Sequence, residues 1–246
     1  MKLLSAFSFL AFTLAACSNP TANAQDAAPA TDVAAPANQL VVAELFTSQG
    51  CSSCPPAEKF FSELAEQDNV MTIEWHVDYW DQLVHGGSRW KDPYSKKDFT
   101  DRQRSYNRSL RGQSGVYTPQ AVVNGHFEGV GSRRGVVTDL IESAPAITVP
   151  VSIENNNVTV GASSKAADIL FVRLLKEQAT NVKGGENKGA KLSGRNIALD
   201  AKVIGKTGSG EVTVSLPALK DGETCAILVQ PQKGDVGPVL GAAKCA

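Results

Sequence analysis

The chain has 246 residues, with 24 Lys and Arg, 25 Asp and Glu, and a formal net charge of −1 at pH 7. It contains no polybasic block, so there is no electrostatic reason to expect a nucleic-acid partner. Residues 39–246 are long enough for two modest domains or one large one.

The N-terminus, MKLLSAFSFLAFTLAAC, predicts a secretory signal peptide over residues 1–16. A positive charge precedes an apolar stretch that is too short to span a membrane. The ending Leu14-Ala15-Ala16-Cys17 resembles a bacterial lipobox, in which the chain is cut before the cysteine and the cysteine is acylated. Ser18 follows, where an Asp would favour the inner membrane. We therefore expect an extracytoplasmic protein, anchored through lipidated Cys17 to the outer membrane and facing the periplasm, with ordinary secretion as the alternative.

Residues 17–38 consist mainly of Ala, Pro, Asn and Thr, with almost no large apolar side chain. Such a segment cannot bury enough surface to offset its ordering entropy, so we expect a flexible tether. Two domains are predicted after it. They are residues 39–145, with an insert at 78–115, and residues 146–246.

The first of these domains begins with a strand, a helix and a second strand. QLVVAELF (39–46) is apolar and rich in β-branched residues, which predicts a strand buried on both faces. Apolar residues then recur at helical spacing behind Pro55-Pro56, a pair that suits a first helical turn. VMTIEWHV (70–77) predicts another buried strand. These lengths indicate a βαβ unit with a parallel sheet.

The rest of the chain changes from mixed to β-rich. Residues 98–111 of the insert have a helical pattern, Asn124-Gly125 predicts a hairpin turn, and residues 132–144 predict another helix. From residue 147 onward, alternating segments separated by turn residues predict a β-sandwich of roughly seven strands.

Cys51 and Cys54 form a C-x-x-C motif directly ahead of the first predicted helix. In a βαβ context this motif is typical of a redox site. Cys51 would lie exposed at the helix N-terminus, where unpaired N–H groups and the helix dipole stabilise a thiolate. Cys54, one turn further in, would be more buried and would resolve a mixed disulfide.

Thr118, Pro119 and Glu44 complete the predicted site. Thioredoxin-like folds place a cis-proline before a short apolar strand, packed against the active-site disulfide, and VYTPQAVVNG has this form. Thr118 and Pro119 would hold a partner's backbone through β-type hydrogen bonds. Glu44, on the first strand, would accept the proton from Cys54.

The segments ELFTSQGCSSCPP, HVDYWD, WKDPYS, FTDRQRSYN and VYTPQAVVNG together closely resemble the secreted thioredoxin-like family known as domain of unknown function 1223. The resemblance is strong over residues 40–145, while GENKG (185–189) and the β-rich remainder match more loosely. It implies a thioredoxin-like domain with a C-x-x-C site and no particular substrate. The predicted fold class is therefore an α/β thioredoxin-like domain followed by an all-β sandwich-like domain.

Other interpretations of the cysteines stay open. Cys51 and Cys54 can form a permanent structural disulfide in a scaffold, or bind Cu(I) or Zn(II) together with His76. Cys225 and Cys245 are an even pair in an oxidising compartment, and we expect a structural disulfide between them.

The sequence thus predicts an extracytoplasmic thiol–disulfide oxidoreductase whose partners are protein or small-molecule thiols and disulfides. No cofactor is expected. A copper or zinc binding and delivery protein is the alternative function.

Overall fold

The computed structural model describes residues 39–231 and 234–245. The predicted signal peptide, Cys17 and the tether lie outside these residues. The helices are α1 (Pro55–Leu64), α2 (Lys97–Arg111) and α3 (Arg134–Glu142), and the strands are β1 (Val41–Thr47), β2 (Val70–His76), β3 (Gln120–Val123), β4 (Phe127–Val130), β5 (Val151–Glu154), β6 (Asn157–Val160), β7 (Asp168–Asn181), β8 (Lys191–Lys206), β9 (Val212–Ser215), β10 (Glu223–Gln230) and β11 (Gly241–Lys244). None of the helices in the described ranges is long and apolar enough to span a membrane.

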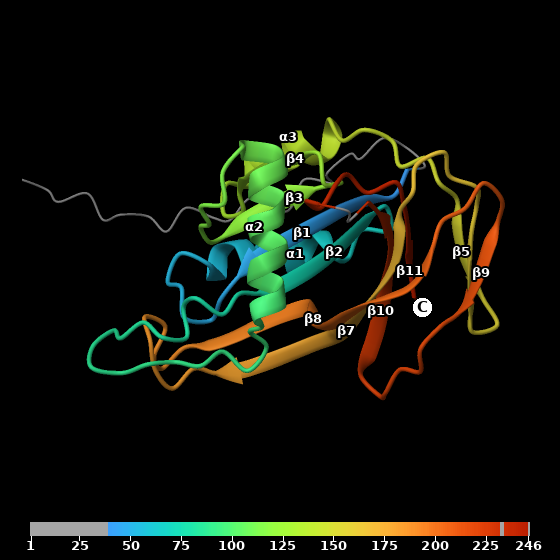
Figure 1. Cartoon of the computed structure of the whole chain (residues 1–246). Helices are drawn as coiled ribbons and strands as arrows, with labels where there is room; N and C mark the ends of the chain where they lie inside the picture. The colour runs from blue at the N-terminus through green and yellow to red at the C-terminus, as the bar shows by residue number, and fades with distance from the viewer. Residues whose placement is uncertain (1–38, 232–233, 246) are drawn as a thin grey trace, which may run out of the picture. The chain divides into compact units, whose positions relative to one another are not determined.

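Eight strands form one mixed sheet in the order β11-β10-β7-β8-β2-β1-β3-β4 (Figure 1). β1 pairs in parallel with β2, with Val41 opposite Val70, and β2 is joined in parallel to β8 where Glu74 lies opposite Ile197. The other neighbours in this sheet are antiparallel. β5, β6 and β9 form a separate three-stranded sheet.

The predicted fold class is wrong. The chain is mainly β, and a single sheet takes strands from both sides of residue 146, in place of a thioredoxin-like domain followed by a β-sandwich. The alternating pattern after residue 147 indicates strands but carries no information about their neighbours. β2 would be an open edge of the isolated βαβ unit, with unpaired N–H and C=O groups, and β8 covers this edge.

The local elements predicted for residues 39–145 are confirmed. β1 and β2 are parallel and are joined through α1, and α2 covers the predicted helix over 98–111. The β3–β4 hairpin turns at Asn124 (φ 48°) and Gly125 (φ 64°), in the left-handed region that a tight hairpin requires. α3 lies within the predicted helix over 132–144.

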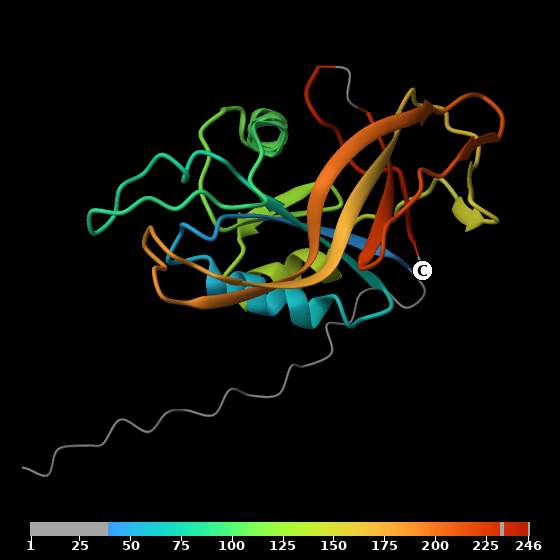
Figure 2. The same cartoon turned by 90° about the horizontal axis from the view of Figure 1, so that it is seen from below.

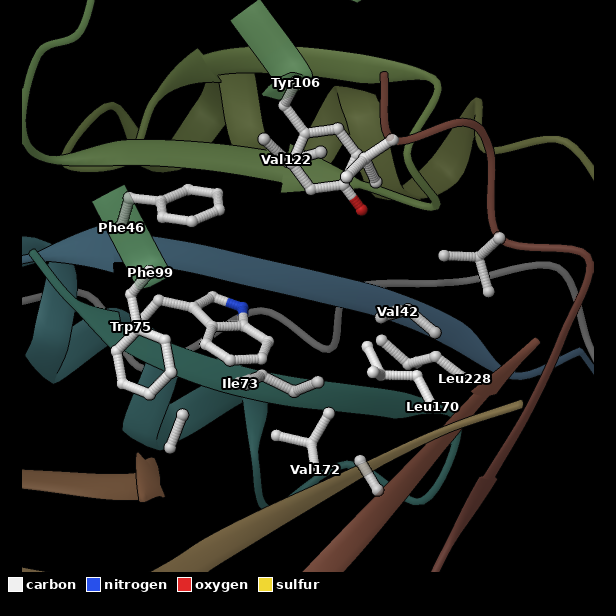
Figure 3. Close-up of a cluster of buried hydrophobic side chains, with 14 of the residues drawn as sticks. Val42, Phe46, Ile73, Trp75, Phe99, Tyr106, Val122, Leu170, Val172 and Leu228 are labelled. Carbon is white, nitrogen blue, oxygen red and sulfur yellow. The ribbon is translucent and has the colours of Figure 1, made fainter. Parts of the chain in front are cut away.

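Alternation along β1 divides the core between the two faces of the sheet. Val42 and Phe46 point to the face covered by α2, where the Tyr106 ring packs edge-on against Phe46 (Figure 3). Ala43 and Leu45 point to the other face, which α1 and α3 cover. Figure 2 shows α2 on one side of the central strands and α1 and α3 on the other.

β7 and β8 are long strands of 14 and 16 residues that pair over most of their length. The pairing shifts register twice, between Ile169 and Leu170 and between Arg173 and Leu174, and both strands curve strongly (Figure 2). One end of the pair lies beside β10. The connection at the other end lies beside the loop between β2 and α2 (Figures 1 and 2). The C-terminal half of the chain thereby reaches the C-x-x-C motif.

A buried ion pair ties α2 to the sheet. Arg102 donates to Glu44 Oε2 from Nε at 2.8 Å and from Nη2 at 2.7 Å, and its Nη2 also reaches Gln230 Oε1 on β10 at 2.9 Å. Glu44 accepts two further hydrogen bonds, from Trp75 Nε1 and the Tyr106 hydroxyl. Because Glu44 is fully buried, these donors replace the water that its carboxylate loses on folding.

Replacing Arg102 with Met keeps an apolar stem but leaves the Glu44 carboxylate buried without its ion-pair partner. We expect the free energy of unfolding to fall by roughly 3–5 kcal/mol, as when one partner of a buried pair is removed. Urea unfolding followed by tryptophan fluorescence measures the change. Arg104→Met is the matched control, since the Arg104 side chain on the same helix is 41% exposed. A loss under about 1 kcal/mol for Arg102→Met would contradict the assigned role.

Candidate functional site

The C-x-x-C motif lies where β1 ends and α1 begins. β1 ends at Thr47, and the turn that follows carries Cys51 and Cys54, whose sulfurs form a disulfide with a Cα–Cα separation of 5.5 Å. The carboxyl ends of the parallel strands β1 and β2 meet at this edge of the sheet. In open sheets with parallel strands, ligand and active sites gather at such an edge.

The helix begins later than expected. Cys54 is the residue that caps α1, and Cys51 precedes it by one turn. Pro55 and Pro56 have no N–H group, while the N–H groups of Ala57 and Glu58 donate to the Cys54 carbonyl. The first helical turn therefore offers few free amide donors to a Cys51 thiolate. Ser53 Oγ lies 3.3 Å from Cys51 Sγ and is a closer polar neighbour.

Both cysteines are buried, with 0% of Cys51 and of Cys54 exposed, whereas we expected Cys51 to be accessible. The cover is the 184–189 loop, Gly184 to Gly189, which connects β7 and β8. Asn187 Nδ2 donates to the Gln49 carbonyl at 3.0 Å and to the Cys51 carbonyl at 2.9 Å. Glu186 Oε2 accepts from the Ser52 N–H at 2.8 Å.

Two glycines allow this loop to lie against the loop between β2 and α2. A Cβ on Gly184 would overlap the backbone carbonyl of Arg89. Gly185 has φ +69°, and a Cβ there would lie 3.1 Å from the Trp90 Cβ and 3.7 Å from the Gly50 Cα. Side chains at these positions would therefore push the loop away from the cysteines.

Pro119 lies beside the first turn of α1. The Thr118–Pro119 peptide bond is cis, and Gly131 donates its N–H to the Pro119 carbonyl at 3.0 Å. A Cβ on Gly131 would be 3.5 Å from both the Pro119 Cβ and the Ala57 Cβ, so only a glycine-sized space separates the proline from the helix. The Thr118 hydroxyl accepts from Trp80 Nε1 at 2.8 Å. Trp80 also packs against Gly50, where a Cβ would lie 3.4 Å from the Trp80 Cβ, and so links the proline loop to the C-x-x-C turn.

Glu44 does not take the expected position. By alternation its side chain points to the α2 face of the sheet, where Arg102 holds it, and α1 with Cys54 lies on the opposite face. The acid on the same face of the sheet as Cys54 is Glu58 of α1, which is four residues after Cys54 and 4% exposed. Its Oε1 accepts from the Thr47 hydroxyl at 2.7 Å.

Glu58 belongs to a buried polar cluster beneath α1. Asp92 Oδ2 lies 2.7 Å from His76 Nδ1 and accepts from the Gln49 N–H at 2.8 Å, which fixes the turn before Cys51. His76 Nε2 lies 4.0 Å from Glu74 Oε2. Among the described residues, neither His76 Nε2 nor either carboxylate oxygen of Glu74 has a hydrogen-bond partner. A buried group of this kind is costly, and native proteins tend to keep it at functional sites.

The charges of this cluster depend on one another. Burial alone would lower the pKa of His76, but the Asp92 carboxylate and, behind it, Glu58 and Glu74 raise this pKa to about 9. Burial raises the pKa of Glu58, and burial together with Glu58 raises the pKa of Glu74 well above its usual range. Burial opposes ionisation of Asp92 as well, but His76 and backbone N–H donors hold its pKa below the ordinary value.

The alternative metal site is not assembled. Within residues 39–231 and 234–245, no three His, Cys, Asp or Glu side chains are arranged to hold a metal ion. His76 lies under α1 with its Nδ1 engaged by Asp92, as described above.

A pocket of about 200 Å³ adjoins the C-x-x-C turn. Its lining residues are Gly50, Trp80, Leu83, Val84, His85, Trp90, Gly185 and Glu186. Leu83 is 51% exposed and Val84 is 59% exposed, so both place apolar surface beside this pocket. The second disulfide joins Cys225 of β10 to Cys245, directly after β11.

Several residues of the site were missed in the sequence. Asp92 and Trp80 belong to the motifs WKDPYS and HVDYWD, but nothing in the spacing shows that both reach the turn before Cys51. GENKG lies in the loop between β7 and β8, and its position over the cysteines depends on the curvature of these two strands.

Comparison with known families matches residues 42–230 to the family described as protein of unknown function (DUF1223). The chain belongs to this family. A search of curated proteins found no match.

Two solved structures are similar to this DUF1223 member. Protein AGR_C_4864 from Agrobacterium tumefaciens is 34% identical, with a TM-score of 0.71 over 83% of this chain and 93% of that chain. HBP35 of Porphyromonas gingivalis is 14% identical, with a TM-score of 0.56 over 84% of this chain and 74% of that chain, and this likeness concerns the fold alone.

The buried cluster predicts how stability depends on pH. His76 keeps its proton up to about pH 9 in the folded state but only to about pH 6.5 when unfolded, so its contribution is complete below pH 6.5 and is lost as pH rises through 9. The raised pKa values of Glu58 and Glu74 act in the same direction above about pH 4.5. We expect the free energy of unfolding to fall by about 1.4 kcal/mol per pH unit between about pH 7 and 9.

Chemical denaturation at a series of pH values measures this slope. His76→Gln should flatten it between pH 7 and 9, and exposed His126→Gln should leave it unchanged. An unchanged slope in His76→Gln would show that His76 is not the titrating group.

Proposed function

We propose that this protein is a thiol–disulfide oxidoreductase that acts through Cys51 and Cys54 outside the cytoplasm. The observation that carries the proposal is a C-x-x-C disulfide at the start of a helix, with Pro119 near the first turn and a loop held over the pair by a few hydrogen bonds. A permanent structural disulfide requires neither a removable cover nor a neighbouring acid cluster.

The proposed reaction starts from the reduced pair. The Cys51 thiolate attacks one sulfur of a client disulfide, a mixed disulfide forms, and the client's other sulfur leaves as a thiolate. Cys54 then loses its proton to Glu58 and attacks Cys51 Sγ. The Cys51–Cys54 disulfide forms again and the client leaves with both sulfurs reduced. The reverse sequence oxidises a client dithiol.

Access to the sulfurs depends on the 184–189 loop. When it moves away, the Ser52 N–H and the carbonyls of Gln49 and Cys51 lose their partners Glu186 and Asn187. These groups, with Thr118–Pro119 on the other side, can pair with an extended client backbone. The pocket beside Leu83 and Val84 can take an apolar side chain of the client.

An insulin-reduction assay with a thiol reductant tests the exchange. The wild type should be active, and Cys51→Ser and Cys54→Ser inactive. Asn187→Ala removes two hydrogen bonds from the closed loop, each worth about 1 kcal/mol, so it should speed reduction of Cys51–Cys54 about 5- to 30-fold.

Lys188→Ala is the matched control, because Lys188 is the exposed next residue of the same loop. Glu58→Gln keeps the side-chain shape but cannot accept a proton, and it should prolong the mixed disulfide. Activity that persists in Cys51→Ser, or no mixed disulfide trapped by Cys54→Ser, would refute the exchange.

We also propose that the protein is exported and held at the periplasmic face of the outer membrane by lipidated Cys17. The lipobox-like sequence supports this. In a Gram-negative host, the wild type should fractionate with outer membranes and Cys17→Ala with the soluble periplasm. Equal membrane recovery of both would contradict the anchor.

A further inference from the structure

The second disulfide, Cys225–Cys245, borders a pocket of about 460 Å³. The pocket lies where β11, β10, β7, β8 and β2 pass beneath the end of α1, and its lining residues are Ala65, Met71, Thr72, Leu174, Lys176, Glu177, Arg195, Asn196, Thr224, Cys225, Lys244 and Cys245. Neither cysteine takes part in the function proposed above.

The two disulfides differ in accessibility. Cys51 and Cys54 are both fully buried, whereas Cys245 is half-buried and Cys225 is 2% exposed. Exchange requires the incoming thiolate to reach a sulfur, so access is one of the factors that set its rate. With the 184–189 loop closed, Cys245 is the cysteine nearer to solvent.

The pocket carries an excess of positive charge. Its lining includes Lys176, Arg195 and Lys244 against the single carboxylate of Glu177. Arg195 is shared between Glu66 and Glu177. The Lys244 ammonium donates to the backbone carbonyls of Gln67 and Asp68, and burial lowers its pKa although the Asp68 carboxylate opposes this. Lys176 is exposed and forms no ion pair with any residue the structure describes.

We propose that this pocket binds low-molecular-weight thiols that carry carboxylates, and that such thiols exchange with Cys225–Cys245. The bound thiolate attacks Cys245 Sγ, the Cys225–Cys245 bond breaks, and its electron pair and the proton from the medium go to Cys225. A second thiol attacks the mixed disulfide on Cys245. Two thiols are thereby oxidised to one disulfide while Cys225 and Cys245 are reduced.

The volume and polar groups of the pocket suit such a ligand. A tripeptide-sized thiol fits within the cavity, and the Thr72 and Asn196 side chains add polar groups beside the cations. Coulomb's law in water gives an effect of roughly threefold in rate for each lysine charge about 6–8 Å from a ligand charge.

The test uses Cys51→Ser/Cys54→Ser protein, so that it does not depend on the proposed function. Reduction of Cys225–Cys245 by glutathione, which is anionic, and by cysteamine, which is cationic, is followed by mass spectrometry of the Cys245 adduct. The ratio of the two rates should be about tenfold higher for folded protein than for the same protein unfolded in urea. Lys176→Gln should lower the ratio about threefold.

Lys202→Gln is the control, because Lys202 is an exposed lysine of β8 outside the pocket. Equal ratios in folded and unfolded protein would overturn the proposal, as would a Lys176→Gln effect no larger than that of Lys202→Gln. A folded protein that forms no adduct with either thiol would overturn it too.

Discussion

The pairing of β8 with β2 is the constraint on which the rest of the structure depends. It converts a βαβ unit and a set of C-terminal strands into one sheet, with Glu74 opposite Ile197 at the junction. It also fixes where the β7–β8 connection ends, over Cys51. β8 and β2 are closely packed at the junction, because a Cβ on Gly194 would overlap the Glu74 carboxylate. The pairing of β8 with β2 therefore places the 184–189 loop over the disulfide and also buries Glu74 beneath α1.

This arrangement makes loop opening part of the proposed chemistry. A sulfur with no exposed surface reacts only in the fraction of molecules whose loop is open, so the observed rate is the intrinsic rate multiplied by that fraction. The closed loop is held by Asn187 and Glu186, whose partners are backbone groups of the C-x-x-C turn. A client backbone can form the same hydrogen bonds. Client binding and opening of the 184–189 loop are then coupled, because the client replaces the loop's hydrogen bonds.

The sequence predicted the local parts of the site and not the long-range ones. Cys51, Cys54 and Pro119 lie together because β1, α1 and β3 are built from short patterns of apolar and turn residues. Alternation alone places Glu44 on one face of β1, but it does not say which helix covers that face, so the sequence assigned the proton-accepting role to Glu44. The position of GENKG depends on register shifts in the pairing of β7 with β8, and the pattern of apolar and polar residues does not predict such shifts.

Glu74 and His76 show that the β2–β8 junction has a cost in folding free energy. Their side chains face each other with unpartnered atoms, at a depth where each lost hydrogen bond is worth about 1–3 kcal/mol. Burial raises the pKa of Glu58, which lies one helical turn after Cys54, so its carboxylate would hold a proton taken from Cys54 more readily than an exposed carboxylate would. A disulfide sealed from water needs an internal group of this kind, because reduction and reoxidation move protons as well as electrons.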